Sequence, residues 1–351
     1  MLAAPTPASP TAPVARSAQT KKPQTLVQIF KSLVITGLKV FCGYVVIVAL
    51  LTAIHFPYRV DELGSPKASH DAGAFYTDIY SAGAPAAPTA PAADEDSKYV
   101  KLAREAIDNE RIIPKITAFA KQYDLAHKRV LDVGAGTGYL QDVVADYVGL
   151  DISPSARRYF HKPFVEASAT DMPFRDGEFD AVWSVWVLEH VPKPEQALVE
   201  IRRVVKDGGL LFLKPAWDCP WWLAQGYEVR PYSDFGAIGK IKKASLNIVA
   251  SPYYRGASLI PSRFLRQTQA RWSGQPTRFH YRVIEPNYDH YWVPDSDALN
   301  TLDYYEMLLW FTSRGDECLN CEAEPIWDAN ELILRVHKKQ SAGVHINPMS
   351  R

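Results

Sequence analysis

Residues 130–138 have the sequence VLDVGAGTG, and residues 148–151 follow as VGLD. Asp132 and Asp151 each end an apolar run, and glycines at 134, 136 and 138 lie between the two runs. Short apolar runs separated by glycines predict a strand, a tight turn, a helix and a second strand. We therefore expect half of a nucleotide-binding α/β unit in this stretch.

The glycine spacing distinguishes between nucleotides. Glycine permits the backbone angles of a sharp turn and a close approach of the backbone to a ligand. A carboxylate at Asp151 offers two acceptor oxygens, which suit a ribose diol. The pattern is GxGxG and not the GxGxxG of dinucleotide sites. Asp132 would repel a pyrophosphate and suits a cationic amino-acid moiety instead.

Further motifs follow the glycine loop in order. They are MPF at 172–174, DGEFD at 176–180, LEHV at 188–191 and VVKDGG at 204–209. Over residues 129–217 this series resembles the class I S-adenosylmethionine (SAM) dependent methyltransferases, type 11, the group that includes ubiquinone and sterol methyltransferases. The resemblance implies an α/β fold with a Rossmann-like seven-stranded sheet, helices on both faces, SAM as cofactor and methyl transfer.

The resemblance also implies roles for residues. Asp151 holds the ribose, Ile152 packs on the adenine, and Trp186 lines the methyl-transfer centre. Ser168 stands where the family often has an aspartate against the adenine amino group, so Ala169 backbone groups share that contact. The methionine end of SAM meets Asp132, Gly134, Ala135 and Gly136. His190 and Glu189 are the nearest candidates for a catalytic base, and the more distant ones are Tyr227, His280 and His290.

Structural interpretations of these residues stay open. Asp151 and Ser153 together suit the start of a helix at Pro154, because Asp, Ser and an early Pro favour that position. Trp186 suits a buried core position. His190 suits a structural role at the start of a helix.

Composition divides the chain into segments. Residues 1–32 form a basic tail rich in Ala and Pro, 57–96 a linker, and 340–351 a second tail. Residues 97–339 form the methyltransferase domain. Residues 33–56 carry Lys39 as their only charge, and about 20 apolar residues cross a bilayer. We expect a transmembrane helix there, with a signal sequence and an organelle transit peptide as alternatives.

Localisation follows from the expected helix, and two arguments disagree about its orientation. Basic residues before the helix outnumber those after it, which predicts a cytoplasmic N-terminus and a catalytic domain across the membrane. SAM is held mainly in the cytosol, which favours a domain on that side. We expect a single-pass membrane protein with its domain on the SAM-containing side, and an organelle membrane remains an alternative.

The net charge of zero hides an asymmetry. Residues 235–284 contain no acid but many Lys and Arg, and residues 285–331 are strongly acidic. Either the two runs neutralise each other in the fold, or the basic region 240–282 binds anionic lipid head groups. The aromatic-rich insertion 217–295 is expected to form a substrate lid. No nucleic-acid-binding module is recognisable, so no nucleic-acid partner is expected.

The C-terminal part predicts a helix over 296–314 and two strands over 317–322 and 332–336. Cys318 and Cys321 form a CxxC, but a structural zinc site needs four ligands, and residues three apart on a strand face opposite ways. No metal site and no disulfide scaffold are therefore expected.

We thus expect an enzyme of class EC 2.1.1.- that transfers a methyl group from SAM to a small or lipid-like acceptor at a membrane surface. The alternative from another class is a non-catalytic, SAM-binding, membrane-associated interaction protein.

Overall fold

The computed structural model describes residues 26–55, 66–81, 97–321 and 331–338. The expected tails 1–32 and 340–351 therefore lie largely or wholly outside the described residues. The chain divides after Ala53 into two compact units, which we describe separately.

The first unit holds most of one long helix, α1 (Leu26–His55). Among the described residues it is the one helix long and apolar enough to cross a membrane, a property that a signal sequence near the N-terminus shares. The expected span 33–56 falls almost entirely within it, but the helix begins earlier, at Leu26.

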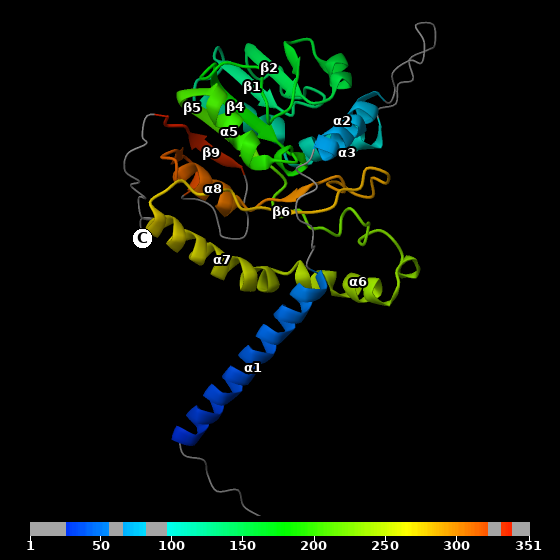
Figure 1. The fold of residues 1–351 in the computed structure, drawn as a ribbon, viewed down its shortest axis with the longest axis vertical. Coiled ribbons are helices and arrows are strands. Elements are labelled where there is room, and N and C mark those ends of the chain that lie inside the picture. Colours follow the sequence, from blue (N-terminus) through cyan, green and yellow to red (C-terminus); the bar gives the residue numbers. More distant parts are fainter. Residues whose placement is uncertain (1–25, 56–65, 82–96, 322–330, 339–351) are drawn as a thin grey trace, which may run out of the picture. The chain divides into compact units, whose positions relative to one another are not determined.

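The second unit is built on a seven-stranded sheet (Figure 1). Its strand order is β3-β2-β1-β4-β5-β9-β8, and every neighbouring pair is parallel except β5–β9 and β8–β9. The strands are β1 (Arg129–Val133), β2 (Asp146–Asp151), β3 (Phe164–Glu166), β4 (Phe179–Val185), β5 (Val205–Lys214), β8 (Glu317–Cys318) and β9 (Leu332–Arg335). The expected Rossmann-like class is confirmed.

This strand order places the site. The chain runs outward from β1 through β2 to β3, and then returns to the other side of β1 to form β4. Such a reversal opens a crevice at the carboxyl ends of the two central strands. The glycine turn follows β1 and Trp186 follows β4, so both lie at that crevice.

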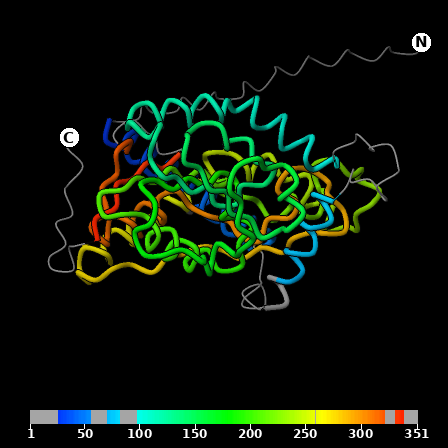
Figure 2. Tube along the Cα trace, turned by 90° about the horizontal axis from the view of Figure 1, so that it is seen from above, coloured from blue at the N-terminus to red at the C-terminus, as the bar shows by residue number. Residues whose placement is uncertain are grey.

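Helices cover both faces of the sheet, because successive strand side chains point in opposite directions. Leu131 of β1 packs with α5 (Pro194–Val204) and α8 (Tyr304–Thr312), whereas its neighbour Val130 packs with α4 (Ile112–Gln122). In Figure 2 the cyan trace of α3 (Lys98–Asn109) and α4 runs along one edge of the tube. Helix α7 (Pro252–Ser273) comes later in the chain.

The expected lid region 217–295 contains α7 and a second helix, α6 (Ala237–Val249). A short ribbon, β6 (Arg282–Val283), pairs with β7 (Asn300–Thr301). Three short 3₁₀ helices complete the fold: η1 (Pro154–Tyr159), η2 (Leu188–His190) and η3 (Tyr232–Asp234).

The helix expected after the glycine loop is absent, and turns connect β1 to β2. Gly134, Gly136 and Gly138 all have positive φ angles, of 74°, 50° and 71°. Helical backbone requires negative φ, so only residues 139–145 remain before β2 begins at Asp146. That stretch is too short for a helix that crosses back over the sheet.

The linker expected over 57–96 contains a helix, α2 (Pro66–Ser81), and the rest of that range lies outside the described residues. Ala72, Tyr76 and Tyr80 are buried, at a spacing of four residues. One face of α2 therefore packs on the domain, beside η1 and α3.

The helix expected over 296–314 begins only at Tyr304. Asp303 accepts hydrogen bonds from the N–H groups of Tyr305 (2.7 Å) and Glu306 (3.3 Å), which makes it a strong N-cap. The helix does not extend to residues before this cap, because Asn300 and Thr301 form β7, which pairs with β6.

The expectation that Cys318 and Cys321 face opposite ways on a strand is wrong, because they form a disulfide. The strand expected over 317–322 ends at Cys318 and the chain turns at residues 319–320. The two Cα atoms are consequently 5.8 Å apart, within the range that a disulfide bridges.

Candidate functional site

The turn after β1 is formed by backbone that only glycine fits. A Cβ atom on Gly134 would lie 2.2 Å from Cγ2 of Val187, and the φ of 74° also disfavours a side chain. The N–H groups of Gly134 and Ala135 both donate to the Leu150 carbonyl, at 2.7 and 2.9 Å. The turn is thereby held against the end of β2.

Asp151 ends β2 and is buried. Its Oδ2 accepts a hydrogen bond from the Gly136 N–H (2.9 Å), and its Oδ1 accepts one from the Ser153 N–H (3.0 Å). Burial raises the pKa of this carboxyl. The Ser153 side chain does not cap η1. Through its two hydrogen bonds Asp151 instead connects the glycine turn to the residues just before η1, so its role is more than that of a helix cap. Each oxygen keeps a lone pair for a further donor.

Asp132 is buried at the end of β1 and accepts a hydrogen bond from the Tyr147 hydroxyl (2.8 Å). Burial raises the pKa of Asp132 to about 7. A nearby cation, such as a ligand ammonium, would stabilise its charged form.

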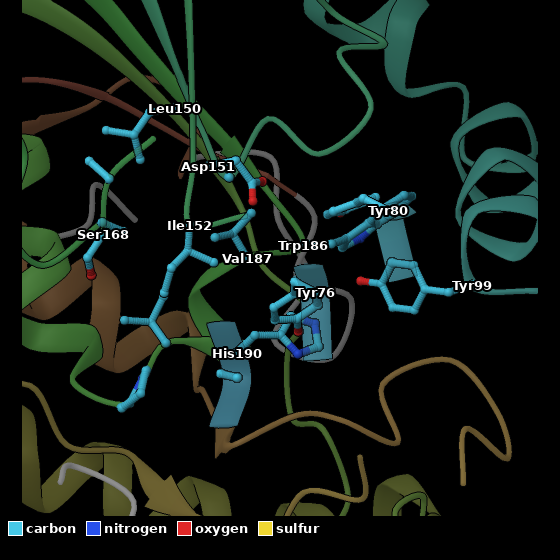
Figure 3. Close-up of a pocket in the computed structure, with 16 residues that line it drawn as sticks. Tyr76, Tyr80, Tyr99, Leu150, Asp151, Ile152, Ser168, Trp186, Val187 and His190 are labelled. Carbon is cyan, nitrogen blue, oxygen red and sulfur yellow. The ribbon is translucent and has the colours of Figure 1, made fainter. Parts of the chain in front are cut away.

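Two cavities lie at the crevice and meet at Tyr80, Tyr99, Gly134 and Trp186, which line both. The first cavity, shown in Figure 3, is also lined by the predicted adenosine residues Asp151, Ile152, Ser168 and Ala169, and by His190. The second is also lined by the predicted methionine residues Asp132, Ala135 and Gly136. The structure thus brings together all nine residues that the sequence resemblance implied for the cofactor.

Trp186 lines both cavities and has a strained backbone conformation. Its φ is 54°, which is unusual for a bulky residue, and its N–H donates to the Lys214 carbonyl (2.8 Å). Trp186 keeps some solvent exposure, unlike the fully buried Trp183 on β4. Strain of this kind concentrates at functional sites, so the geometry favours a role in the site over a core role.

Ser168 uses its hydroxyl locally. The hydroxyl lies 2.8 Å from that of Thr170 and also accepts a hydrogen bond from the Thr170 N–H (3.2 Å). The side chain therefore stabilises the turn after β3, although the residue lines the first cavity.

Opposite the glycine turn stands a wall that the motifs did not indicate. Tyr76 and Tyr80 of α2 and Tyr99 of α3 line the first cavity beside His190 (Figure 3). We call these four residues the tyrosine–histidine wall, and Asp132, Gly134, Gly136 and Asp151 the glycine-loop wall. The spacing of four residues between Tyr76 and Tyr80 was the available signal, since it places both rings on one helix face.

His190 is surrounded by carboxylates. Its Nδ1 lies 3.4 Å from Asp297 Oδ2, and its Nε2 lies 3.7 Å from Glu189 Oε1 and 4.0 Å from Asp295 Oδ1. Burial by itself would lower the pKa of His190, but these three negative neighbours raise it above the usual value. The Tyr76 hydroxyl donates to Asp297 Oδ2 (2.7 Å) and fixes that carboxylate from the other side.

Glu189 lies behind His190 and lines neither cavity. It is fully buried, and its Oε1 accepts a hydrogen bond from the Ala216 N–H (3.0 Å). Burial raises its pKa. Glu189 is therefore placed to position His190 and not to touch an acceptor. No metal site was expected, yet Glu189, His190 and Asp295 bring three potential ligand atoms within 4.8 Å of one another.

The more distant base candidates line neither cavity. Tyr227 stacks on Phe235, with ring centroids 4.4 Å apart. His290 stacks on Trp292, and His280 is exposed. The structure does not bring these three side chains to the site.

Comparison with known proteins shows what the sequence of this domain is similar to. A family model described as a methyltransferase domain matches residues 131–213. A ubiquinone biosynthesis O-methyltransferase from Dechloromonas aromatica is 40% identical over 106 residues, 25% of this chain and 44% of that protein. A fatty-acid O-methyltransferase from Mycolicibacterium smegmatis is 34% identical over 119 residues, 29% of this chain and 43% of that protein.

A demethylmenaquinone methyltransferase from Renibacterium salmoninarum is 42% identical over 93 residues, 24% of this chain and 39% of that protein. The chain thus spans less than half the length of the curated relatives it matches.

The fold and these matches define a class I SAM-dependent methyltransferase domain. This chain contains such a domain, and S-adenosylmethionine is its cofactor.

Proposed function

We propose that this protein transfers a methyl group from SAM to a small, lipid-like acceptor at a membrane surface. One observation carries the proposal: the nine residues implied for SAM line two cavities that meet at Gly134 and Trp186, and His190 stands on the far side of the first. The relatives' names include two quinone-pathway enzymes and a fatty-acid enzyme, which supports a lipid-like acceptor.

The residues present fit SAM. Gly134 leaves open a cradle that a Cβ would close against Val187, and buried Asp132 offers a carboxylate for an ammonium group. We assign the adenosine end to Asp151, Ile152, Ser168 and Ala169, and the methionine end to Asp132, Gly134, Ala135 and Gly136. The cofactor supplies a methyl group already activated by a sulfonium. Trp186 then borders the point where the two ends meet.

The tyrosine–histidine wall faces the acceptor. Its rings supply apolar surface and exclude water, and His190 can take a proton from an acceptor that must lose one. Asp297 holds the His190 ring through Nδ1 and stabilises its charged form. A well-placed base of this kind contributes about 100- to 10,000-fold to a rate.

The membrane and domain assignments belong to the same proposal. The apolar helix α1 would anchor the protein, with the catalytic domain on the SAM-containing side. The insertion 217–295 would cover the acceptor. The flanking ranges keep their predicted roles as tails and linker where the structure does not describe them.

The test uses the full chain reconstituted in phospholipid vesicles. SAM and NADH are titrated separately by calorimetry, and tritiated SAM is then incubated with a demethylated quinol and with a long-chain fatty acid. We expect SAM to bind, NADH not to bind, and tritium to enter an organic-soluble product. Binding of SAM with no transfer to either acceptor class would favour the non-catalytic alternative. Absence of SAM binding would overturn the site assignment.

A further inference from the structure

Helix α7 has its charged and apolar faces the opposite way round from an ordinary surface helix. Among described residues outside α1, every exposed large apolar side chain except Ile113 and Val199 lies between Val229 and Trp272. On α7 these residues are Tyr253, Ile260, Phe264, Leu265 and Trp272, with exposures of 50–86%. A surface helix usually turns such residues toward the core.

Three of the four arginines of α7 form ion pairs with the domain. Arg263 forms a salt bridge with Asp303 (3.1 Å), and Arg266 forms one with Glu306 (2.9 Å), both at the start of α8. Arg255 likewise pairs with Asp218. At 100° per residue, Arg255 and Arg266 lie on the far side of the helix from Tyr253, Ile260 and Phe264, and Arg263 lies at the edge between the two faces. Ion pairs thus fix α7 to the domain with its apolar face outward.

These pairs also decide between the two interpretations of the charge asymmetry. Part of the basic run 235–284 is neutralised by the acidic run that follows it, through Asp303 and Glu306. The cations left exposed on the basic run include Lys240, Arg271, Arg278 and Arg282. An exposed apolar stripe on helices that also carry the exposed cations Lys240 and Arg271, with no acid in the segment, matches the interface of an anionic bilayer.

The neighbouring helix extends this surface. Ile238, Ile241 and Ile248 of α6 are 52–69% exposed. Tryptophan and tyrosine, such as Trp272 and Tyr253, favour the boundary between head groups and acyl chains. We call the exposed apolar residues of α6 and α7 the apolar ridge.

We propose that the apolar ridge is a membrane-docking surface that lies in the plane of an anionic bilayer and inserts its side chains among the head groups. This inference deepens the proposed membrane location, on which it rests, and is independent of methyl transfer. It assigns to α7 a contact with lipid beyond the crossing by α1. In Figure 1 α7 runs along the outside of the domain, away from the strands, where a flat surface can reach it.

The experiment places an environment-sensitive fluorophore on the ridge of the full-length protein. Cys42→Ser removes the exposed native thiol, Cys219 is buried, and Cys318 and Cys321 are paired. Phe264→Cys then carries the probe on the ridge. Val199→Cys on α5, 48% exposed and also apolar, carries it in the matched control. Both proteins are reconstituted in phosphatidylcholine–phosphatidylserine vesicles that contain spin-labelled lipid.

We expect several-fold stronger quenching by spin-labelled lipid at position 264 than at 199. Ile260→Asp in the labelled protein should remove most of that quenching, since it puts a negative charge on the half-exposed ridge that faces anionic lipid. Equal quenching at 264 and 199 would overturn the inference. The inference would also be overturned if, without vesicles, the probe at 264 became shielded from water as the protein concentration rises. That result would indicate that a second copy or a protein partner covers the ridge.

The same vesicles separate this inference from the proposed function. If tritium transfer continues while the probe at 264 stays in water, only the docking surface is wrong. If the probe is quenched but no acceptor is methylated, the docking surface stands and the proposed reaction does not.

Discussion

The glycine-loop wall and the tyrosine–histidine wall face each other but are built in different ways. The first comes from one short stretch of chain, and its key hydrogen bond joins Gly136 to Asp151, 15 residues apart. The second depends on a hydrogen bond between Tyr76 and Asp297, 221 residues apart. A local motif can thus be recognised from spacing, while an assembled wall exists only once the chain has folded. Cofactor affinity and turnover should accordingly be separable.

The largest expected effect lies on the tyrosine–histidine wall. His190→Gln should lower kcat by about 100- to 10,000-fold, because the variant has no base at that position. Calorimetry should show unchanged SAM affinity. His280→Gln, on an exposed histidine outside both cavities, is the control and should keep full activity. A large loss of SAM binding in His190→Gln would break the separation of the two walls.

The next effect tests the glycine-loop wall. Gly134→Ala should weaken SAM binding by about 10- to 100-fold, since a methyl group forced against Val187 costs roughly 1–3 kcal/mol. Gly208→Ala is a matched control with a φ of 76° and no atom within 4 Å of the added Cβ. Both variants share the backbone strain, so the difference between their SAM dissociation constants isolates the contact. Equal constants would mean that the cradle is unimportant.

A third variant sharpens the comparison through pH. Neutral His190 is the active base, so turnover should rise as pH increases through its raised pKa. Asp297→Asn removes one of the charges that raise the pKa of His190, so half-maximal kcat should move to lower pH. Tyr76→Phe removes the hydrogen bond but no charge, and its profile should keep the wild-type midpoint. An unshifted Asp297→Asn profile would show that Asp297 has only a structural role.

The smallest expected effect concerns stability. Burial raises the pKa of Asp132 to about 7 from its usual value near 4. The pKa of Asp132 is higher in the folded protein than in the unfolded chain. The neutral Asp132 carboxyl therefore contributes its full share of folding stability below the unfolded pKa, and this contribution is lost as the pH rises through about 7.

Asp132→Asn cannot ionise, so without SAM it should melt a few degrees above wild type at pH 8, and at nearly the same temperature at acidic pH. Thermal melts across pH check this prediction, with exposed Asp289→Asn as the control. If the difference in melting temperature between Asp132→Asn and wild type does not grow between acidic pH and pH 7, ionisation of Asp132 does not cause the loss of stability.

Much of the sheet could be predicted because its strands are apolar runs bounded by glycine and aspartate. Residues 130–133, 148–151 and 210–213 all fall within strands, and the order of motifs implied the sheet. The nine cofactor positions could be named because the resemblance to class I methyltransferases implies a role for each of them. Their roles remain predictions.

The parts that could not be predicted depend on contacts between distant segments. Tyr76 and Tyr80 have helical spacing, but their partners Asp297 and Tyr99 are known only from the fold. Residues 296–301 have a helical pattern, yet pairing with β6 overrides it. A turn after Cys318 interrupts the strand that was expected over 317–322, and it brings Cys318 and Cys321 together. Three alternating glycines with positive φ, at 134, 136 and 138, occupy the start of the stretch that was expected to form a helix.

The cysteine pair has a consequence for the orientation of the chain. Disulfides persist in oxidising compartments and are kept reduced in the cytosol. Trapping free thiols in intact cells with a mass tag would therefore reveal the side of the membrane on which the catalytic domain resides. Two tags on Cys318 and Cys321 would place the domain in the cytosol with the SAM pool. No tags there would place it across the bilayer, as the basic residues before α1 predict, and would require SAM to be imported to it.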